Sequence, residues 1–383
     1  MYLSKVLKVL YSPRKTLKEV IQEPKYIGPV LILVLLVAVN IASAYVIFSK
    51  EYYQQVLPNT GVDTWTESSS YWTSPNANVS QSSDSITGTY YGNASIAFSN
   101  QNSTQVSMRL SGVGSINCSA QGGYDLLSFR IKWTGPQGTP NNLTMELYSA
   151  NSSSDYFYDN LTDTFSNSTY NIWNNFTIPL ASGWPSLGQP DWSTITGLQL
   201  QFTWAQNSNI TLLIDGLFFR GPYEPLLQTA GAAYPLSYGV PGALQYVVTW
   251  VLLTGMIYVV AKAFKGKIVW KPMLIAIGFL LITMCIGTLI TGIGYATLPT
   301  LHYPFDLYGG VQGEGRAALN TITDQAAVAT DIGLIAQLLV WVWTAALASI
   351  AIRQMTEFSW PKSTAVAIIA YMVTILLVII IIG

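Results

Sequence analysis

Histidine and cysteine are nearly absent from this sequence, and their scarcity excludes several kinds of site. The single histidine, His302, excludes histidine-based catalytic triads and most zinc or iron sites. The two cysteines are too few for a disulfide framework. Cys118 lies in a polar region and Cys285 lies midway along an apolar run, so we expect no disulfide bond between them.

Charged residues are also scarce, and those present are unevenly distributed. They make up 10% of the chain, against about a quarter in typical soluble domains. Residues 51–239 hold 12 acids and 4 bases, whereas residues 1–26 hold 6 bases and 2 acids. No region is strongly basic, so we expect no nucleic-acid partner. The composition is that of a membrane protein with a separate polar domain.

Five long apolar runs contain no Lys, Arg, Asp or Glu. Each is about 21 residues long, which gives about 32 Å of helix and matches the hydrocarbon thickness of a bilayer. The predicted transmembrane helices are residues 27–48, 240–260, 272–293, 332–352 and 363–382. We therefore expect a membrane α-helical bundle of five transmembrane helices in contact with lipid.

The loops that flank these helices predict an orientation. Basic residues precede the first run, separate the second from the third, and separate the fourth from the fifth. Because basic loops stay in the cytoplasm, the N-terminus is predicted to be cytoplasmic. The large domain, an outer loop at 295–331 and the C-terminus are then extracellular, in a multi-pass cell-membrane protein. The basic residues are Lys5, Lys8, Arg14, Lys15, Lys18, Lys25, Lys262, Lys265, Lys267, Lys271, Arg353 and Lys362.

The first run has an alternative interpretation, because Ala42-Ser43-Ala44 resembles a signal-peptidase site. The basic region of 26 residues and the apolar stretch of 22 residues are both long for a signal peptide. We therefore expect the first run to stay in the protein as a transmembrane helix.

Residues 1–26 are predicted to form a cytoplasmic amphipathic segment. Apolar residues recur at helical spacing with lysines off that face, which is typical of a helix lying on the inner leaflet. Ser12-Pro13 then starts a second helix, because Ser is a good N-cap and Pro suits the first turn. The apolar faces comprise Leu3, Val6, Leu7 and Leu10 in the first helix and Leu17, Val20 and Ile21 in the second.

Short motifs beside the apolar runs resemble those of a known family. The motifs are Ser12-Pro13-Arg14-x-Thr16-Leu17 and Glu23-Pro24 before the first run, the basic turn 261–267, Pro299 after the third run, and the link 352–363. With five runs at this spacing, residues 1–50 and 240–383 resemble the Yip family of five-span membrane proteins. In eukaryotes the resemblance implies vesicle traffic and binding of small GTPases. This chain departs from the family pattern, because about 190 residues are inserted between its first two runs.

The inserted region is predicted to be an extracellular all-β sandwich at 49–220, followed by a linker at 221–239. Apolar and β-branched runs alternate with Gly, Pro, Asn and Ser turns at roughly 8–15 residues, without helical periodicity. The predicted strands are residues 95–98, 106–110, 126–133, 143–148, 173–178, 197–204 and 210–219. Residues 123–132, 173–180, 192–198 and 213–219 resemble strands of jelly-roll domains of the galactose-binding and carbohydrate-binding-module type.

Two candidate binding sites follow from this domain. Trp184 and Trp192 lie in a Gly/Pro-rich segment and are predicted to stack on sugar rings, whereas tryptophans within strands are predicted to be core. The jelly-roll resemblance also implies a structural calcium site, and Glu67 and Asp215 occupy the matching places. Calcium takes six or more oxygen ligands, so a hydrogen-bonding role for Asp215 in a turn stays open.

Glycosylation sequons are dense in the outer domain. Their number is more than twice that expected by chance from the Asn, Ser and Thr content of the region. Sequons on an exposed surface domain predict a glycoprotein. Dense sequons with few charges and no disulfides are typical of an archaeal surface protein. The asparagines are Asn78, Asn93, Asn102, Asn117, Asn142, Asn151, Asn160, Asn167, Asn175 and Asn209.

No constellation of catalytic residues emerges, so no enzymatic activity is expected. The Gly-rich stretch 309–315 has no phosphate-binding pattern and is predicted to be a mobile loop before a short helix at 316–329. The leading hypothesis is a Yip-like membrane anchor that presents a sandwich for recognition of surface glycans or for assembly with envelope proteins. The alternatives are a channel or transporter with a regulatory ectodomain, and a membrane-trafficking protein. No cofactor is certain beyond the candidate calcium.

Overall fold

Five helices long and apolar enough to cross a membrane occur among the residues that the computed structural model describes, which are 2–59, 61–120, 122–149, 154–180 and 183–382. The chain divides into two units. The first, here called the bundle, consists of Met1–Glu51, Pro225–Leu301 and Thr323–Gly383. The second, the sandwich unit, consists of Tyr52–Glu224 and His302–Ile322.

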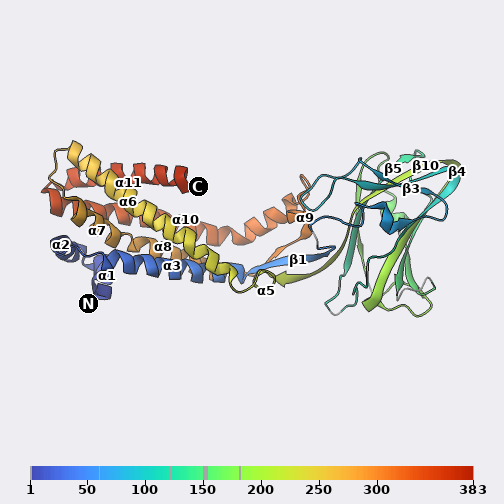
Figure 1. Ribbon diagram of the computed structural model, residues 1–383, viewed down its shortest axis with the longest axis horizontal. Coiled ribbons are helices and arrows are strands. Elements are labelled where there is room, and N and C mark those ends of the chain that lie inside the picture. Colours follow the sequence, from blue (N-terminus) through green and yellow to red (C-terminus); the bar gives the residue numbers. More distant parts are fainter. Residues whose placement is uncertain (1, 60, 121, 150–153, 181–182, 383) are drawn as a thin grey trace. The chain divides into compact units, whose positions relative to one another are not determined.

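The transmembrane helices follow the predicted runs closely (Figure 1). They are α3 (Ile27–Phe48), α6 (Gly239–Ala263), α7 (Trp270–Leu280) with α8 (Ile282–Ala296), α10 (Arg316–Thr356) and α11 (Trp360–Ile382). The predicted set of five transmembrane helices is therefore confirmed. α10 is longer than its apolar run, because the polar residues 316–331 continue the same helix. Apolar side chains such as Val240, Val342 and Ile380 are exposed on the bundle, as expected for helices that contact lipid.

A buried tyrosine connects three segments of the bundle. The Tyr246 hydroxyl on α6 lies 3.0 Å from the Pro29 carbonyl oxygen of α3 and 2.9 Å from the Gly278 carbonyl oxygen of α7. Polar groups inside a membrane protein need internal partners, since lipid offers none. This hydroxyl meets that need where α3, α6 and α7 pack together.

The N-terminal helices α1 (Tyr2–Tyr11) and α2 (Pro13–Gln22) pack on the bundle, and one predicted face needs correction. Their apolar side chains that are at most 3% exposed are Val6, Val9, Leu17 and Val20. Leu7 is 49% exposed, so the predicted apolar face of α1 is wrong there, and Val9 packs inward instead. The side chain of Leu3 lies outside the described part of the chain. α2 begins at Pro13 as predicted, but Ser12 makes no side-chain cap.

The sandwich unit is built from antiparallel strands with short helical turns between them. The strands are β1 (Glu51–Leu57), β2 (Trp72–Thr73), β3 (Asn78–Ser82), β4 (Ser95–Leu110), β5 (Leu126–Gly135), β6 (Asn142–Ser149), β7 (Tyr156–Asn160), β8 (Asn174–Pro179), β9 (Ser186–Leu187), β10 (Ile195–Pro225) and β11 (Leu301–Tyr303). The short α-helices of this unit are α4 (Thr162–Phe165) and α9 (Phe305–Tyr308), whereas α5 (Leu226–Thr229) belongs to the bundle. Two pairs of predicted strands merge into the long strands β4 and β10.

β4 and β10 are long enough to run through both layers of the sandwich. The first half of β10 pairs with the end of β4 and with β6, whereas its second half pairs with the start of β4 and with β5. One layer, here called the covered sheet, has the order β3-β4-β10-β5-β8. The other, the polar sheet, has the order β2-β4-β10-β6-β7-β9.

Alternate residues of each strand fill the space between the layers. In β5, Leu127, Phe129, Ile131 and Trp133 are at most 1% exposed and belong to the shared core. This period of two is the expected signature of a strand with one face on a core. The predicted fold class, a helical membrane bundle with an all-β sandwich, is confirmed.

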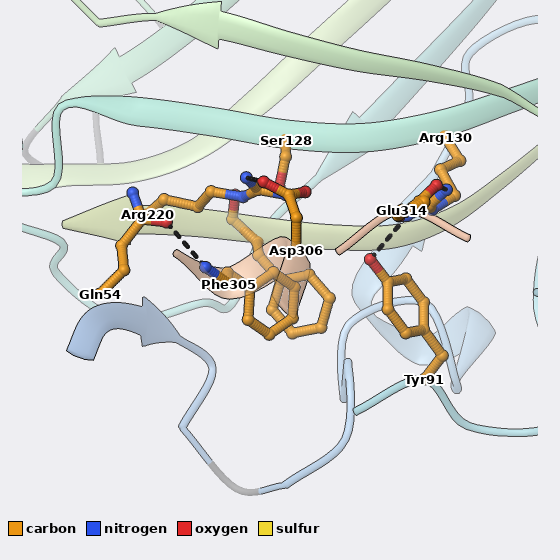
Figure 2. Close-up of polar contacts among 9 residues, drawn as sticks. Gln54, Tyr91, Ser128, Arg130, Arg220, Phe305, Asp306 and Glu314 are labelled. Carbon is orange, nitrogen blue, oxygen red and sulfur yellow. Dashed lines mark hydrogen bonds and ion pairs between the residues drawn. The ribbon is translucent and has the colours of Figure 1, made fainter. Parts of the chain in front are cut away.

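The segment His302–Ile322, here called the docked loop, belongs to the sandwich unit although in sequence it follows α8 and includes the first turns of α10. The covered sheet presents Arg130 and Arg220 on its outer face, each with a side chain only 5% accessible. The docked loop supplies a carboxylate to each of them, Glu314 and Asp306 (Figure 2). The prediction of a mobile loop is therefore wrong.

Both ion pairs have bidentate geometry. The two terminal nitrogens of Arg130 each lie 2.6 Å from an oxygen of Glu314, and those of Arg220 lie 2.8 and 2.9 Å from the oxygens of Asp306. Arg220 also donates from Nε to the Ser128 hydroxyl at 3.0 Å. Arginine–carboxylate pairs with two parallel hydrogen bonds are among the strong charge-assisted interactions in proteins. They hold the docked loop on the sheet.

Apolar contacts complete the docking. Phe305 is 1% exposed and packs against Tyr91 and against Phe218 of β10. Its backbone N–H donates to the Gln54 side chain at 3.1 Å. The hydroxyl of Tyr308 donates to the Gln54 carbonyl oxygen. The docked loop thus forms a third layer over the covered sheet.

We predict that Arg130→Ala lowers the free energy of unfolding of the sandwich unit by about 2–4 kcal/mol. Removing one partner leaves Glu314 without its cation, and the loss is below that of a fully buried pair because the Glu314 side chain is 26% accessible. The measurement is thermal or denaturant unfolding of the full-length protein in detergent, with limited proteolysis at residues 302–322.

Lys132→Ala is the matched control, because Lys132 lies two residues further along β5 and pairs with Asp84, whose side chain is 45% accessible. An exposed pair of this kind contributes about 1 kcal/mol or less. Equal protease sensitivity of the two variants would contradict the docking account.

Candidate functional site

The outer face of the polar sheet carries a row of polar side chains across four strands. Gln199 of β10 lies directly opposite Arg109 of β4 on one side and Glu146 of β6 on the other. Glu146 in turn lies opposite Tyr158 of β7. The neighbouring residues along each strand, such as Met108 and Leu198, are fully buried in the core. The row therefore points away from the core.

Two further tyrosines complete this surface, which is here called the polar face and comprises Arg109, Glu146, Tyr148, Tyr156, Tyr158 and Gln199. The Arg109 guanidinium lies 4.4 Å over the Tyr148 ring, and the Tyr148 hydroxyl donates to Glu146 at 2.5 Å. The rings of Tyr148 and Tyr156 are 5.8 Å apart, and Tyr158 is 42% exposed.

Electrostatics favour a neutral, donating Tyr148 hydroxyl. Burial raises the pKa of Tyr148, and the hydrogen bond to the carboxylate of Glu146 raises it further, while Arg109 opposes the shift. Gln199 Nε2 also donates to the same Glu146 oxygen at 3.4 Å. Glu146 is therefore held in place by two donors, and the amide oxygen of Gln199 and the guanidinium of Arg109 are the remaining groups for a ligand.

Donors, an acceptor and aromatic rings on one flat sheet suit a ligand rich in hydroxyl groups. Sugar hydroxyls need both donors and acceptors, and the apolar faces of sugar rings pack on aromatic rings. None of these residues was singled out from sequence. The available signal was the alternation Thr144-Met145-Glu146-Leu147-Tyr148, which predicts that residues 144, 146 and 148 share one face.

The predicted ligand residues Trp184 and Trp192 lie together, but not on the polar face. Their rings are 5.9 Å apart and nearly perpendicular. The Trp192 ring stacks on Phe157 with 4.0 Å between centroids. Phe157 points into the core, whereas its neighbours Tyr156 and Tyr158 belong to the polar face. The two tryptophans therefore pack at the core side of β7, and one face of Trp192 is already covered.

The predicted calcium residues Glu67 and Asp215 are brought together, and Asp63 joins them. One carboxylate oxygen from each lies within 4.8 Å of the others. Asp63 and Asp215 are almost fully buried, at 0% and 1% exposed. Hard oxygen donors of this kind fit calcium in their chemistry. Sequence reasoning missed Asp63, since nothing in its local pattern links it to a residue 152 positions later.

Many oxygens of this acidic cluster already accept hydrogen bonds. Asp215 accepts from the backbone N–H groups of Ile86 at 2.6 Å and Gly216 at 2.7 Å. Asp63 accepts from the Gly216 N–H at 2.9 Å and from the Thr66 hydroxyl at 2.5 Å. These bonds correspond to the turn role that the sequence left open for Asp215.

The Glu67 carboxylate is also engaged. It accepts from the backbone N–H groups of Asn93 and Ala94, both at 3.1 Å. A cation would have to share these oxygens with the chain's own donors.

Sequon asparagines are mostly exposed on the sandwich unit. Asn142 is the exception, because it is half-buried and its side-chain oxygen accepts from Asn160 Nδ2 at 3.2 Å. Asn151 lies outside the described residues. The exposed asparagines are Asn78, Asn93, Asn102, Asn117, Asn160, Asn167, Asn175 and Asn209.

We predict that the sandwich unit loses stability between about pH 4 and pH 8. Burial, and then the neighbouring Asp63, raise the pKa of Asp215 from its ordinary value of 3.8 to about 8. The folded protein therefore holds a proton that the unfolded chain releases, so the stabilisation is complete below the lower value and is lost as pH rises to the upper one. Thermal midpoints of wild type and Asp215→Asn across this range test it. If the thermal midpoint of Asp215→Asn fell with pH as steeply as that of wild type, the prediction would be contradicted.

Calcium binding stays a prediction, with a test in the same assay. A dication requires both buried carboxylates ionised, so added calcium should raise the thermal midpoint more at pH 8.5 than at pH 5.5. Asp63→Asn should abolish that difference. An unchanged midpoint in calcium and in chelator at both pH values would exclude a structural calcium site.

Solved structures with similar folds cover about two fifths of the chain. One is a family 11 carbohydrate-binding module from Clostridium thermocellum in complex with a β-1,3-1,4-mixed-linked tetrasaccharide, with 17% identity and a TM-score of 0.27 over 43% of this chain and 94% of that one. Another is an exo-β-agarase, with 12% identity and a TM-score of 0.29 over 42% of this chain. This chain covers only 24% of the agarase. All these TM-scores are below 0.5, and we infer no binding or activity from them.

Family comparison gives a firmer result. No curated protein matches the chain significantly. The Yip1 domain matches residues 169–382, which is more than half of the chain and includes four of the five transmembrane helices. The chain is therefore a multi-pass membrane protein that belongs to the Yip1 family.

Proposed function

We propose that this protein is a non-enzymatic surface glycoprotein whose Yip1-type bundle anchors a glycan-binding sandwich on the extracellular side. The observation that carries the proposal is the polar face. Its cross-strand row of Arg109, Gln199, Glu146 and Tyr158 combines donors, an acceptor and an aromatic ring on a rigid sheet.

A rigid sheet is a suitable platform for an extended oligosaccharide. Side chains two residues apart on one strand lie about 7 Å apart, and adjacent strands lie about 5 Å apart. A second, shorter row, Gln201 and Thr144, runs parallel to the first on the same face. Successive sugar residues would each meet a new pair of polar groups. Because the sheet is already ordered, binding would cost little conformational entropy in the protein.

The same face argues against hydrolysis of the bound sugar. Glycoside hydrolysis uses two carboxyl groups on opposite sides of the scissile bond. Among the residues of the two rows, only Glu146 has a carboxylate, and Tyr148 and Gln199 both donate to it. We therefore assign Glu146 to binding and propose no catalytic residue.

The proposed orientation is supported by the clustering of basic groups at one end of the bundle. Lys362 donates to the Phe264 carbonyl oxygen at 3.0 Å, and the Arg353 guanidinium lies 4.2 Å over the Trp360 ring. Gln354 donates to the Arg14 carbonyl oxygen at 2.7 Å, which brings the N-terminal helices to the same end. Basic residues gathered in this way favour a cytoplasmic location for that end.

We predict that Gln199→Ala and Tyr158→Ala each weaken glycan binding by about tenfold, through loss of one hydrogen-bonding or stacking group. The measurement is a glycan array with the full-length protein in a detergent that has no sugar headgroup, followed by titration of the best ligand. Gln206→Ala is the matched control, because Gln206 is exposed but lies outside both rows.

Trp184→Ala separates the two candidate surfaces. Binding that survives in this variant and fails in Gln199→Ala assigns the ligand to the polar face. Loss of binding in Trp184→Ala alone would assign it to the two tryptophans. Absence of any glycan ligand for the wild type would refute the proposed function.

We also predict that most of the exposed sequon asparagines carry glycans in the native host. Their side chains are accessible, and the proposed orientation places them on the side where glycans are attached. Intact mass of the protein purified from its native membrane checks this. A mass equal to that of the unmodified chain would contradict the predicted glycosylation. It would also remove the support that glycosylation gives to an extracellular sandwich.

A further inference from the structure

A polar cavity lies among four helices of the bundle. It has a volume of about 390 Å³ and is bounded by α6, α8, α10 and α11. Its polar lining residues are Gln245, Thr249, Thr288, Thr291, Gln337 and Thr374. A cavity of this size can hold one sugar-sized group. Its lining is unusual for a membrane interior, where ungrouped polar side chains are costly.

The two glutamines of this cavity lack protein partners. Among the described residues, none forms a hydrogen bond with the side-chain amide of Gln245 or Gln337. By contrast, the hydroxyls of Thr291 and Thr374 donate to the carbonyl oxygens of Gly287 and Ala370 on their own helices. Polar groups within spanning helices normally bond to a neighbouring helix or to a ligand. Both glutamines are exposed on the bundle rather than enclosed in it, so the two amides are available to a polar molecule that enters the cavity from its open side.

An apolar pocket adjoins the polar cavity. Its volume is about 370 Å³, and its walls come from α10 and α11, including Leu338, Val342 and Met372. Trp341, Tyr371 and Ile375 line both spaces. The two spaces thus share part of their walls, and the first adds several polar side chains to a lining that is otherwise apolar in both. A molecule that fits both has a polar part and an apolar part.

The depth of the polar cavity suits a lipid headgroup. Gln245 is the seventh residue of α6, about 9 Å along the helix from its start. Gln337 lies five residues into the predicted apolar run of α10, which is about 8 Å along the axis. Both glutamines therefore lie near the membrane boundary opposite the basic loops, where lipid headgroups meet the hydrocarbon region.

The charge of the lining selects among headgroups. No Lys, Arg, Asp, Glu or His occurs among the described residues that line either space. An anionic phosphate would be recognised by arginine or lysine, which are missing from this set. Amides and hydroxyls instead match a neutral headgroup with several hydroxyl groups. We propose that the bundle binds a neutral glycolipid, with its sugar against Gln245 and Gln337 and its chain between α10 and α11.

This proposal is independent of glycan binding by the sandwich, since it uses other residues and another ligand. The probe is a monoglucosyl diacylglycerol added to the full-length protein in a detergent without a sugar headgroup. Native mass spectrometry counts the retained lipid. Gln245→Leu and Gln337→Leu are expected to reduce retention by about fivefold each, because each removes one hydrogen-bonding group. Leucine suits a membrane interior, so these variants should keep the fold.

A second variant tests the apolar half. Ala346 lines the apolar pocket and is exposed, so Ala346→Phe should fill the space and reduce lipid retention without disturbing the core. Gln228→Leu is the matched control, because Gln228 is an exposed amide on α5, remote in sequence from every residue that lines the two spaces. It should retain the glycolipid as wild type does.

Three outcomes would overturn the proposal. The first is equal retention by wild type and the Gln245→Leu and Gln337→Leu variants. The second is equal retention of phosphatidylglycerol, which would show that the headgroup is not selected. The third is displacement of the glycolipid by free glucose at comparable concentration, which would assign the cavity to a soluble sugar.

Discussion

Two bidentate arginine–carboxylate pairs determine how the sandwich unit is assembled. Arg130 and Arg220 stand on the outer face of the covered sheet, where their guanidinium groups are almost fully buried. Buried cations of this kind are tolerated only when paired and hydrogen-bonded. Glu314 and Asp306 meet this requirement, and both come from a segment that follows the third transmembrane helix in sequence. The sandwich is therefore incomplete without a loop that follows the third transmembrane helix in sequence.

Because the docked loop must cover one sheet, the two sheets have different roles. The covered sheet is occupied by the docked loop, whose aromatic residues Phe305 and Tyr308 bury its outer surface. The polar sheet keeps Tyr158 exposed and Tyr156 and Gln199 partly exposed, and it is the surface proposed to bind glycan. A soluble fragment limited to residues 52–224 would lack Glu314 and Asp306, so Arg130 and Arg220 would lose their partners. Binding studies therefore call for the full chain.

Local patterns in the sequence were enough to predict the elements but not the contacts between distant ones. Length and the absence of charge identified the five transmembrane helices, and alternation identified the strands of the core. The docked loop was missed because Arg130 and Glu314 are 184 residues apart and neither has a local signature of pairing. Asp63 was missed for the same reason. Trp192 looked like an open stacking surface, but its ring packs on Phe157 of another strand.

The central claim is that glycan binds on the polar face, and oxidative footprinting in the presence and absence of ligand tests it most directly. Tyr158 is exposed and Tyr156 is half-buried, so both should be oxidised in the free protein. The account predicts that a saturating glycan protects these two tyrosines and leaves Trp184 unchanged. Protection of Trp184 and Trp192 with no change at Tyr158 would contradict it.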